Sequence, residues 1–101
     1  MYNVHLALSV SDYLNGIPDD EISRDGLDRL IAEFSQELGE RADDFHRMYP
    51  TRHESLRFEY EIAFVELGSL HLFRLIVDMS HASFGVVTVV CIDRQRLHSP
   101  S

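Results

Sequence analysis

The sequence contains no lysine, no tryptophan and only one cysteine, Cys91, among its 101 residues. A single cysteine excludes an intrachain disulfide and every site in which several cysteines bind zinc or an iron–sulfur cluster. Because all nine basic residues are arginine, a lysine Schiff base, a lysine general base and the lysine of a P-loop are excluded too. The five glycines are too scattered for a dinucleotide-binding fingerprint. We therefore expect no cofactor.

Long hydrophobic runs are also missing. No stretch approaches the ~18 consecutive apolar residues that a membrane-spanning helix needs, and the first residues lack the basic and then apolar pattern of a signal peptide. Hydrophobic residues make up 45% of the chain and charged residues 26%, which is ordinary for a globular protein. We expect one cytoplasmic domain over residues 1–101 that does not contact a membrane.

The acidic excess lies in one early segment. Residues 12–44 contain eleven acidic residues and three arginines, so this segment accounts for the formal net charge of −8. The residues from 45 onward carry six acids and six arginines, together with five of the six histidines. An acidic surface of this kind keeps a protein soluble, binds a basic partner or mimics nucleic acid. It also disfavours non-specific binding of nucleic acid by the protein itself.

Hydrophobic periodicity predicts a strand followed by helices in the first half of the chain. In residues 2–8, large apolar residues occupy every second position, as in a half-buried strand. Residues 9–14 indicate a short helical turn, and the proline and acids of residues 17–21 are typical of a helix start. Apolar residues at helical spacing over residues 27–48 predict a long amphipathic helix with a break or bend near Gly39.

The second half of the chain predicts three strands. Residues 56–66 and 70–78 alternate in the same way and form an antiparallel hairpin around a turn at residues 68–69. Residues 86–92 are almost wholly apolar, which suits a central strand covered on both faces, and residues 93–101 form a polar tail. The fold class is therefore α+β: a strand, one or two helices and a three-stranded antiparallel meander, with the helices packed on one face of a four-stranded sheet.

The spacing of histidines and nucleophiles favours neither a metal site nor a catalytic triad. No two of the six histidines lie four residues apart, and no carboxylate–histidine run resembles a metalloprotease motif, so we expect no metal site. No serine lies in a nucleophile elbow. Cys91 lies in the most apolar predicted strand, where cysteine is usually an inert hydrophobic side chain. Glu59 and Glu61 share one face of a strand, as exposed acids commonly do.

Arginines near the C-terminal strands are the best candidates for chemistry. Arg74 lies in an otherwise apolar strand, where a charge is costly unless it is paired or reaches an open sheet surface. It either forms a structural ion pair, with Asp78 or a glutamate of the neighbouring strand, or binds phosphate on an exposed sheet face. Arg94, Arg96 and His98 follow the last strand closely enough to reach the same surface. Such a cluster could hold an RNA phosphate and donate a proton to the leaving group.

Several short motifs resemble those of the RelE/ParE-type bacterial toxins. Residues 2–6 (YNVHL), residues 13–18 (YLNGIP) and the helix over residues 27–38 are similar to the strand and helical hairpin with which these toxins begin. Residues 73–77 (FRLIV) are similar to a family strand that carries an arginine, and residues 86–94 are similar to the family's final strand. The resemblance implies the same order of strand, helices and meander.

The resemblance also implies site residues. It matches Arg74 and Arg94 to family arginines and places His98 near a C-terminal tyrosine or histidine, so these three residues are the candidate catalytic residues. Val77 and Asp93 stand where the family has an aromatic residue and a histidine. Members of the family that act on the ribosome are usually basic, whereas this chain is acidic.

Three hypotheses from different classes follow. The first is a RelE/ParE-like toxin of a toxin–antitoxin module, such as a ribosome-dependent mRNA endonuclease or a gyrase poison, whose partners would be RNA, the ribosome and an antitoxin. The second is a small acidic inhibitor, such as an immunity, antitoxin-like or phage anti-defence protein. Its acidic helical face, with Asp19, Asp20, Glu33 and Glu37 as partner-binding residues, would block a basic nucleic-acid-binding site of a partner protein. The third is a structural or oligomerising domain whose arginines only form ion pairs.

Overall fold

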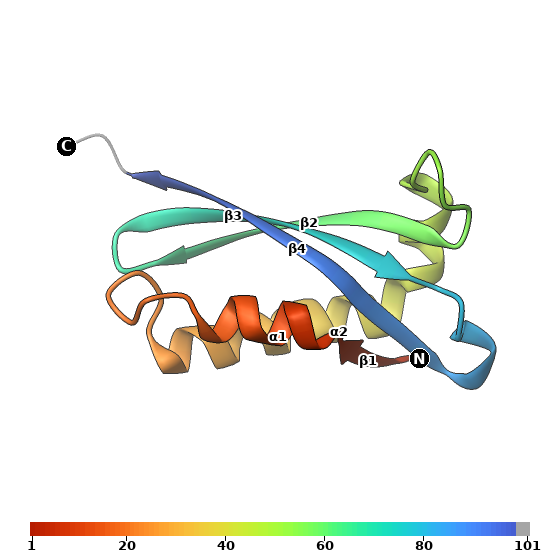
Figure 1. Ribbon diagram of the computed structural model, residues 1–101, viewed down its shortest axis with the longest axis horizontal. Coiled ribbons are helices and arrows are strands. Elements are labelled where there is room, and N and C mark those ends of the chain that lie inside the picture. The colour runs from red at the N-terminus through yellow and green to blue at the C-terminus, as the bar shows by residue number, and fades with distance from the viewer. Residues whose placement is uncertain (99–101) are drawn as a thin grey trace.

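The computed structural model describes residues 1–98, with residues 99–101 and the side chain of His98 outside the description. Figure 1 shows helices lying along a long, twisted sheet. The elements follow in the order β1 (Asn3–Leu6), α1 (Leu8–Asn15), α2 (Arg24–Met48), β2 (Arg57–Glu66), β3 (Ser69–Asp78), the 3-10 turn η1 (Ala82–Phe84) and β4 (Val86–His98).

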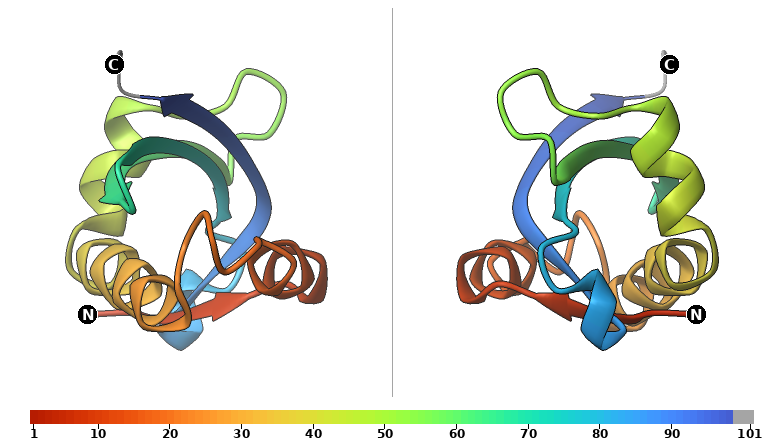
Figure 2. Two further views of the ribbon diagram at one scale, coloured as in Figure 1. Left: turned by 90° about the vertical axis from the view of Figure 1, so that its left-hand side faces the viewer. Right: turned by 90° about the vertical axis from the view of Figure 1, so that its right-hand side faces the viewer.

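The four strands form one mixed sheet in the order β1-β4-β3-β2. β2, β3 and β4 make an antiparallel meander, and β1 pairs in parallel with the start of β4. In the end-on views of Figure 2 the sheet curls over one side of the core, and α1 and α2 close the other side. The predicted α+β architecture, with helices on one face of a four-stranded sheet, is confirmed.

One stripe of α2 and alternate residues of the sheet form the core. Leu30, Phe34 and Leu38 of α2 are fully buried, at the spacing predicted for its apolar face. They belong to the same hydrophobic cluster as the helix-facing side chains of the sheet, among them Phe58 and Phe73. Burial of each such side chain contributes roughly 1.5–3 kcal/mol to stability. Within residues 1–98 no helix covers the opposite face of β2, β3 and β4, and we call this face the open face.

The second helix begins later than its sequence pattern predicts. Residues 17–21 form a turn, which the buried side chain of Ile22 anchors to the core. α2 begins at Arg24, because the hydroxyl of Ser23 accepts a hydrogen bond from the Gly26 N–H at 3.0 Å and so caps the helix. The predicted helix start at residues 17–21 is therefore wrong, since proline and acids also suit a turn.

The bend predicted near Gly39 is present two residues later. Arg41 leaves the helical conformation with φ −126° and ψ 16°, and the backbone just before β1 contacts α2 close to this bend. There the Tyr2 N–H donates to the Gly39 carbonyl oxygen at 2.9 Å, and the Tyr2 hydroxyl donates to Asp43 at 2.7 Å. A β-carbon at Gly39 would lie 3.0 Å from the Tyr2 carbonyl oxygen, so glycine permits this close approach.

The hairpin between β2 and β3 turns one residue earlier than predicted. Its two central residues are Leu67, with φ 51°, and Gly68, with φ 78°. Positive φ at both positions matches the twist of the flanking strands. Glycine adopts this conformation at no steric cost, whereas leucine rarely does. Leu67 is also exposed.

The last strand is longer than predicted and contains a bulge. Residues 93–98, expected as a polar tail, continue β4 and pair with β3. The register shifts within the strand, because Ile76 lies opposite Cys91 whereas Val77 lies opposite Val89. Val90 is therefore an extra residue, and the side chains beyond it change faces.

The bulge decides which side chains of β4 meet the helices. Before it, Val89 faces the helices and is buried. Beyond it, Arg94 and Arg96 take the helix-facing positions, and Cys91 lies exposed on the open face. The prediction of a strand covered on both faces is wrong, because the open face of β4 has no covering element among the described residues.

Candidate functional site

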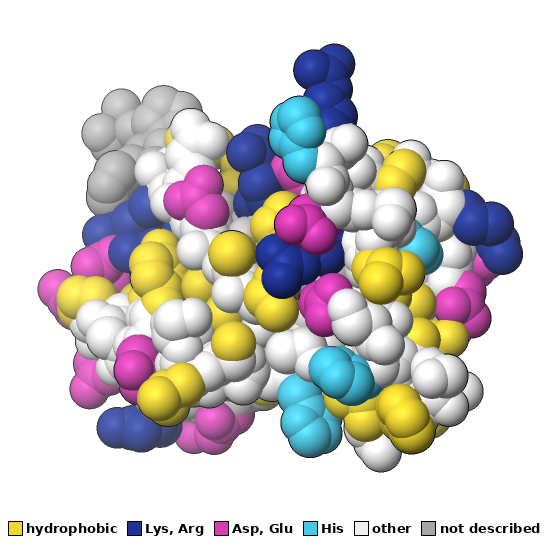
Figure 3. All heavy atoms as spheres, turned by 45° about the vertical axis from the view of Figure 1, so that its right-hand side comes forward, with side chains coloured by type: hydrophobic (Ala, Val, Ile, Leu, Met, Phe, Trp, Pro, Cys, Tyr) yellow, Lys and Arg dark blue, Asp and Glu magenta, His cyan; other side chains and the backbone are white. Residues whose placement is uncertain are grey.

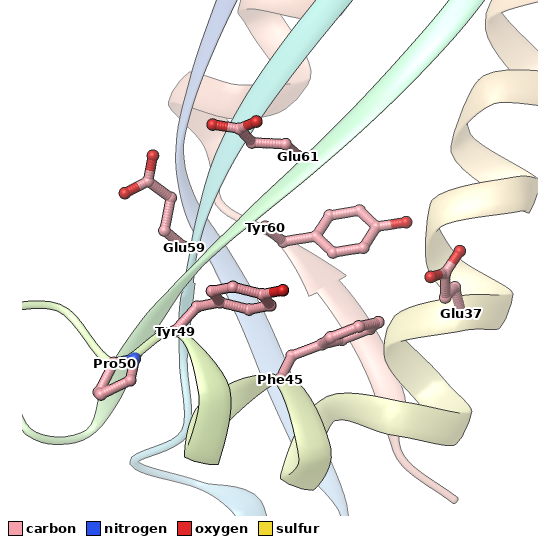
Figure 4. A pocket seen from close by; sticks show the side chains of 7 residues that line it. All are labelled: Glu37, Phe45, Tyr49, Pro50, Glu59, Tyr60 and Glu61. Carbon is pink, nitrogen blue, oxygen red and sulfur yellow. The ribbon is translucent and has the colours of Figure 1, made fainter.

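A groove runs between α2 and the outer edge of β2. One part is a hollow of about 560 Å³ lined by Glu37, Phe45, Tyr49, Pro50, Glu59, Tyr60 and Glu61, whose arrangement is drawn in Figure 4. A second hollow of about 560 Å³ shares Glu37 and is lined by Glu33, Gln36, Glu37, Glu40, Arg41 and Ile62. We call the two hollows together the acidic groove.

The charge of the acidic groove is predominantly negative. Its lining contains five carboxylates and one guanidinium. That guanidinium, on Arg41, lies over the Phe45 ring at 4.9 Å from the ring centroid. The α2 wall is formed by Glu33, Glu37 and Glu40, which make no ion pair within residues 1–98. Their spacing of four and three residues places the three carboxylates on one side of the helix.

Tyr60 joins the two walls of the groove. In Figure 4 its ring extends from β2 and its hydroxyl points toward Glu37 on α2. Burial raises the pKa of the Tyr60 phenol, and hydrogen bonding to Glu37 and the negative charges of Glu37 and Glu33 raise it further, whereas Arg41 opposes them. The phenol therefore stays protonated over the physiological range, with its hydroxyl directed at the Glu37 carboxylate. The ring also packs on Phe45, with centroids 5.2 Å apart.

The other two carboxylates of the groove reach the opposite side of β2. Glu59 and Glu61 point away from Glu37 in Figure 4, toward the open face. There the Arg74 Nε lies 2.6 Å from Glu59 and 3.6 Å from Glu61. Arg74 therefore offsets one of the two negative charges on this rim, whereas the α2 carboxylates have no ion-pair partner within residues 1–98.

The four partner-binding residues predicted from the sequence fall into two separate places. Glu33 and Glu37 line the acidic groove. Asp19 and Asp20 are exposed on the loop before α2 and do not line it. Since an α-helix rises about 1.5 Å per residue, Glu33 lies roughly 14 Å along the axis from the helix start. The long acidic segment is thus not one continuous contact surface.

The three predicted catalytic residues are not brought together in the part of the chain that the structure describes. Arg74 lies on the open face with 57% of its side chain exposed. Arg94 lies beyond the bulge on the helix-facing side, where only 16% of its side chain is exposed. The His98 backbone ends β4, opposite Ser69, and its side chain lies outside the described part. Arg74 therefore has the exposed position predicted for a phosphate-binding guanidinium, together with the glutamate pairing predicted for a structural role.

A polar cluster that the sequence does not reveal surrounds Glu21. One oxygen of its carboxylate lies 2.9 Å from the Arg94 Nη2 and 3.3 Å from the Arg96 Nη1. The Arg96 Nε donates to the Ser69 hydroxyl at 3.4 Å. These contacts attach the loop before α2 to β3 and β4. A single carboxylate thus serves two guanidinia that are largely withdrawn from solvent.

His71 completes this cluster from inside the core. It is fully buried, stacks on Phe73, and its Nδ1 lies 3.4 Å from the Arg94 Nη1. Burial lowers the pKa of His71, and the positive charges of Arg94 and Arg96 lower it further, whereas the backbone and carboxylate of Glu21 oppose them. Because a guanidinium can only donate, Nδ1 accepts and the proton of the neutral ring lies on Nε2.

The remaining surface shows no comparable concentration of one charge in the view of Figure 3. Among the described residues visible there, basic and acidic side chains are neighbours, and histidines and hydrophobic side chains are scattered between them. Leu8 and Phe84 are the most exposed hydrophobic residues after Met1, at 76% and 81%. Single exposed hydrophobic residues are common on soluble proteins and do not by themselves mark a binding site.

Metal and membrane sites receive no support from the described residues. Within residues 1–98, no group of three or more histidine, cysteine or acidic side chains is arranged to hold a metal ion. Neither of the helices described there is long and apolar enough to cross a membrane. Comparison with protein-family models, with curated proteins and with solved structures finds no match to this chain. The resemblance to RelE/ParE-type toxins therefore stays a prediction.

Proposed function

We propose that this protein is a small acidic inhibitor that binds a basic partner protein through the acidic groove and blocks the partner's nucleic-acid-binding surface. The observation that carries the proposal is the row of carboxylates Glu33, Glu37 and Glu40, which have no ion-pair partner within residues 1–98 and lie beside the rings of Tyr49 and Tyr60. Carboxylates bind guanidinium and ammonium groups, and aromatic faces attract the same cations.

The choice of a nucleic-acid-binding partner follows from the charge pattern. Proteins that bind nucleic acid carry arginine and lysine in rows that match successive phosphates. A helix with carboxylates at four- and three-residue spacing presents a comparable row of negative charge. The net charge of −8 would also steer a basic partner toward this protein and make association fast and salt-dependent.

The test is competition with nucleic acid. Basic DNA- and RNA-binding proteins from the same cell are each loaded with a fluorescent oligonucleotide, and displacement by the purified protein is followed by fluorescence anisotropy. The groove variant Glu33→Arg/Glu37→Arg should require at least about tenfold more protein for displacement. The loop variant Asp19→Arg/Asp20→Arg has the same change in net charge and should weaken displacement much less, because it changes only the long-range attraction of the partner.

Two results would contradict the proposal. One is a wild-type protein that displaces no oligonucleotide from any tested partner at low salt. The other is equal weakening by the groove variant and the loop variant, because the groove would then contribute nothing beyond overall charge.

A RelE/ParE-like toxin is the second proposal, and the exposure of Arg74 on the open face favours it. A guanidinium that is 57% exposed can reach a phosphate after exchanging its contact with Glu59. The two proposals use opposite sides of β2, so variants of Arg74 and of Glu33 and Glu37 separate them.

A further inference from the structure

β2 lies at the edge of the sheet, and part of that edge has no partner. β2 is the last strand in the order β1-β4-β3-β2. The segment after α2 covers its beginning, since the Thr51 N–H donates to the Arg57 carbonyl oxygen at 2.9 Å and the Glu59 N–H donates to the Tyr49 carbonyl oxygen at 3.0 Å. The backbone groups of odd-numbered β2 residues therefore point outward.

The same alternation leaves three further residues unpaired. Glu61, Ala63 and Val65 continue the outward-pointing series, and all three are exposed. No group within residues 1–98 forms a hydrogen bond with their backbone on this edge. An edge of this kind is a template for another extended chain. It forms one wall of the acidic groove, because Glu61 and the neighbouring Ile62 line the two hollows.

We propose that the partner enters the groove as an extended basic segment that adds as a fifth strand beside Glu61, Ala63 and Val65. This inference rests on the proposed function and names the form of the ligand. Backbone hydrogen bonds to β2 would supply affinity for any sequence, and the side-chain alternation of a strand would supply selectivity.

The selectivity follows from the two faces of the added strand. Every second side chain would lie on the helix side of the sheet, where Glu33, Glu37 and Glu40 stand on α2 without ion pairs. Arginine or lysine at those positions would pair with the carboxylates of α2. The side chains between them would extend the open face beside Ala63 and Val65, where small or β-branched residues fit.

A second copy of this chain is disfavoured as the occupant. Pairing of two β2 edges would bring two rows of α2 carboxylates, Glu33, Glu37 and Glu40 from each copy, to the same seam. Each copy also has a net charge of −8, so repulsion would oppose the contact.

The probe is an acetylated, amidated heptapeptide in which threonine and arginine alternate. The matched control has the same sequence with N-methyl groups on the threonine nitrogens, which keeps the charge and removes backbone donors. The unmodified peptide should bind at least about tenfold more tightly than the control. It should also slow hydrogen exchange of the Glu61, Ala63 and Val65 amides at least about tenfold, as measured by NMR.

A protein variant tests the same contact from the other side. Ala63→Pro removes one outward donor at an edge position that tolerates proline, and Ala63→Ser retains that donor. Ala63→Pro should weaken binding of the unmodified peptide severalfold while its other amide signals stay in place, and Ala63→Ser should not.

The outcomes separate this inference from the proposed function. If both peptides bind equally and the three amides stay unprotected, strand addition is refuted, while oligonucleotide displacement by the full-length protein still decides the proposed function. If neither peptide binds at low salt, strand addition is likewise refuted. A protein that sediments as a dimer, with the three amides protected before peptide is added, would make a second copy the occupant and overturn the inference.

Discussion

The carboxylate of Glu66 accepts two hydrogen bonds from Ser23, one from the hydroxyl at 2.6 Å and one from the backbone N–H at 3.3 Å. Ser23 caps α2 and Glu66 ends β2, so this contact attaches the start of the helix to the hairpin. Arg29 approaches the other oxygen of Glu66 at 3.4 Å. These contacts hold the pKa of Glu66 below its usual value, with the Ser23 hydroxyl as the largest cause.

The first prediction concerns Gly26, which lies under this carboxylate. Replacing a helical glycine with alanine normally stabilises a helix by up to about 1 kcal/mol. Here a β-carbon at Gly26 would lie 1.9 Å from the Glu66 Oε2, so Gly26→Ala must displace the carboxylate from Ser23. The variant should lower the urea midpoint of the wild type but raise that of Glu66→Ala. The same direction of change in both backgrounds would contradict this contact.

The second prediction concerns the pH dependence that His71 causes. Its folded pKa lies below the unfolded value of 6.5, so the unfolded chain binds a proton that the folded chain does not. The contribution of His71 to stability is therefore present above pH 6.5 and is lost as pH falls. Between about pH 7 and about pH 5, the free energy of unfolding should fall more for the wild type than for His71→Gln. Parallel pH profiles in urea titrations would show that His71 titrates normally.

The third prediction concerns the carboxylate that Arg94 and Arg96 share. Glu21→Gln removes the charge and leaves two guanidinia in a site where their side chains are 16% and 30% exposed. We expect a loss of about 2 kcal/mol in the free energy of unfolding. Asp44→Asn, which breaks the exposed ion pair with Arg47, is the control and should cost less than about 0.5 kcal/mol. Equal effects of the two substitutions would mean that the Glu21 cluster is fully solvated.

The fourth prediction separates the two proposed functions. Arg74→Ala should change the free energy of unfolding by less than about 1 kcal/mol, because the ion pairs of Arg74 with Glu59 and Glu61 are largely exposed. In a cell-free bacterial translation reaction, the toxin proposal predicts that the wild type cleaves mRNA and that Arg74→Ala does not. The inhibitor proposal predicts no cleavage by either protein. Cleavage by both would exclude Arg74 from any catalytic site.

Most of the fold follows from periodicity in the sequence. Strand alternation and the three- and four-residue spacing of α2 predict the α+β class, the hairpin and the face on which the helices pack. The bend near Gly39 was also predictable, because glycine weakens a helix. Its missing side chain also permits the close approach of the Tyr2 backbone. These features depend on local backbone preference and on average burial, and both can be inferred from the type of residue at each position.

The candidate site is less predictable, because it depends on which face a side chain reaches. The bulge at Val90 lies in a run of apolar residues with no local signal, so the helix-facing positions of Arg94 and Arg96 could not be foreseen. Tyr60 alternates with polar residues as a core residue would, and only the path of α2 brings Glu37 to its hydroxyl. A long helix beside an edge strand creates the groove through residues far apart in the sequence.

The single extra residue at Val90 also sets the phase of everything that follows it in β4. If Val90 paired with Ile76 instead of forming the bulge, the remainder of the strand would be inverted. Arg94 and Arg96 would turn outward on the face that carries Arg74, and Asp93 and Gln95 would turn inward. The protein would lose the anchor for Glu21 and gain two further outward-facing arginines. The bulge therefore keeps two of the arginines inside the protein, where they hold the loop before α2.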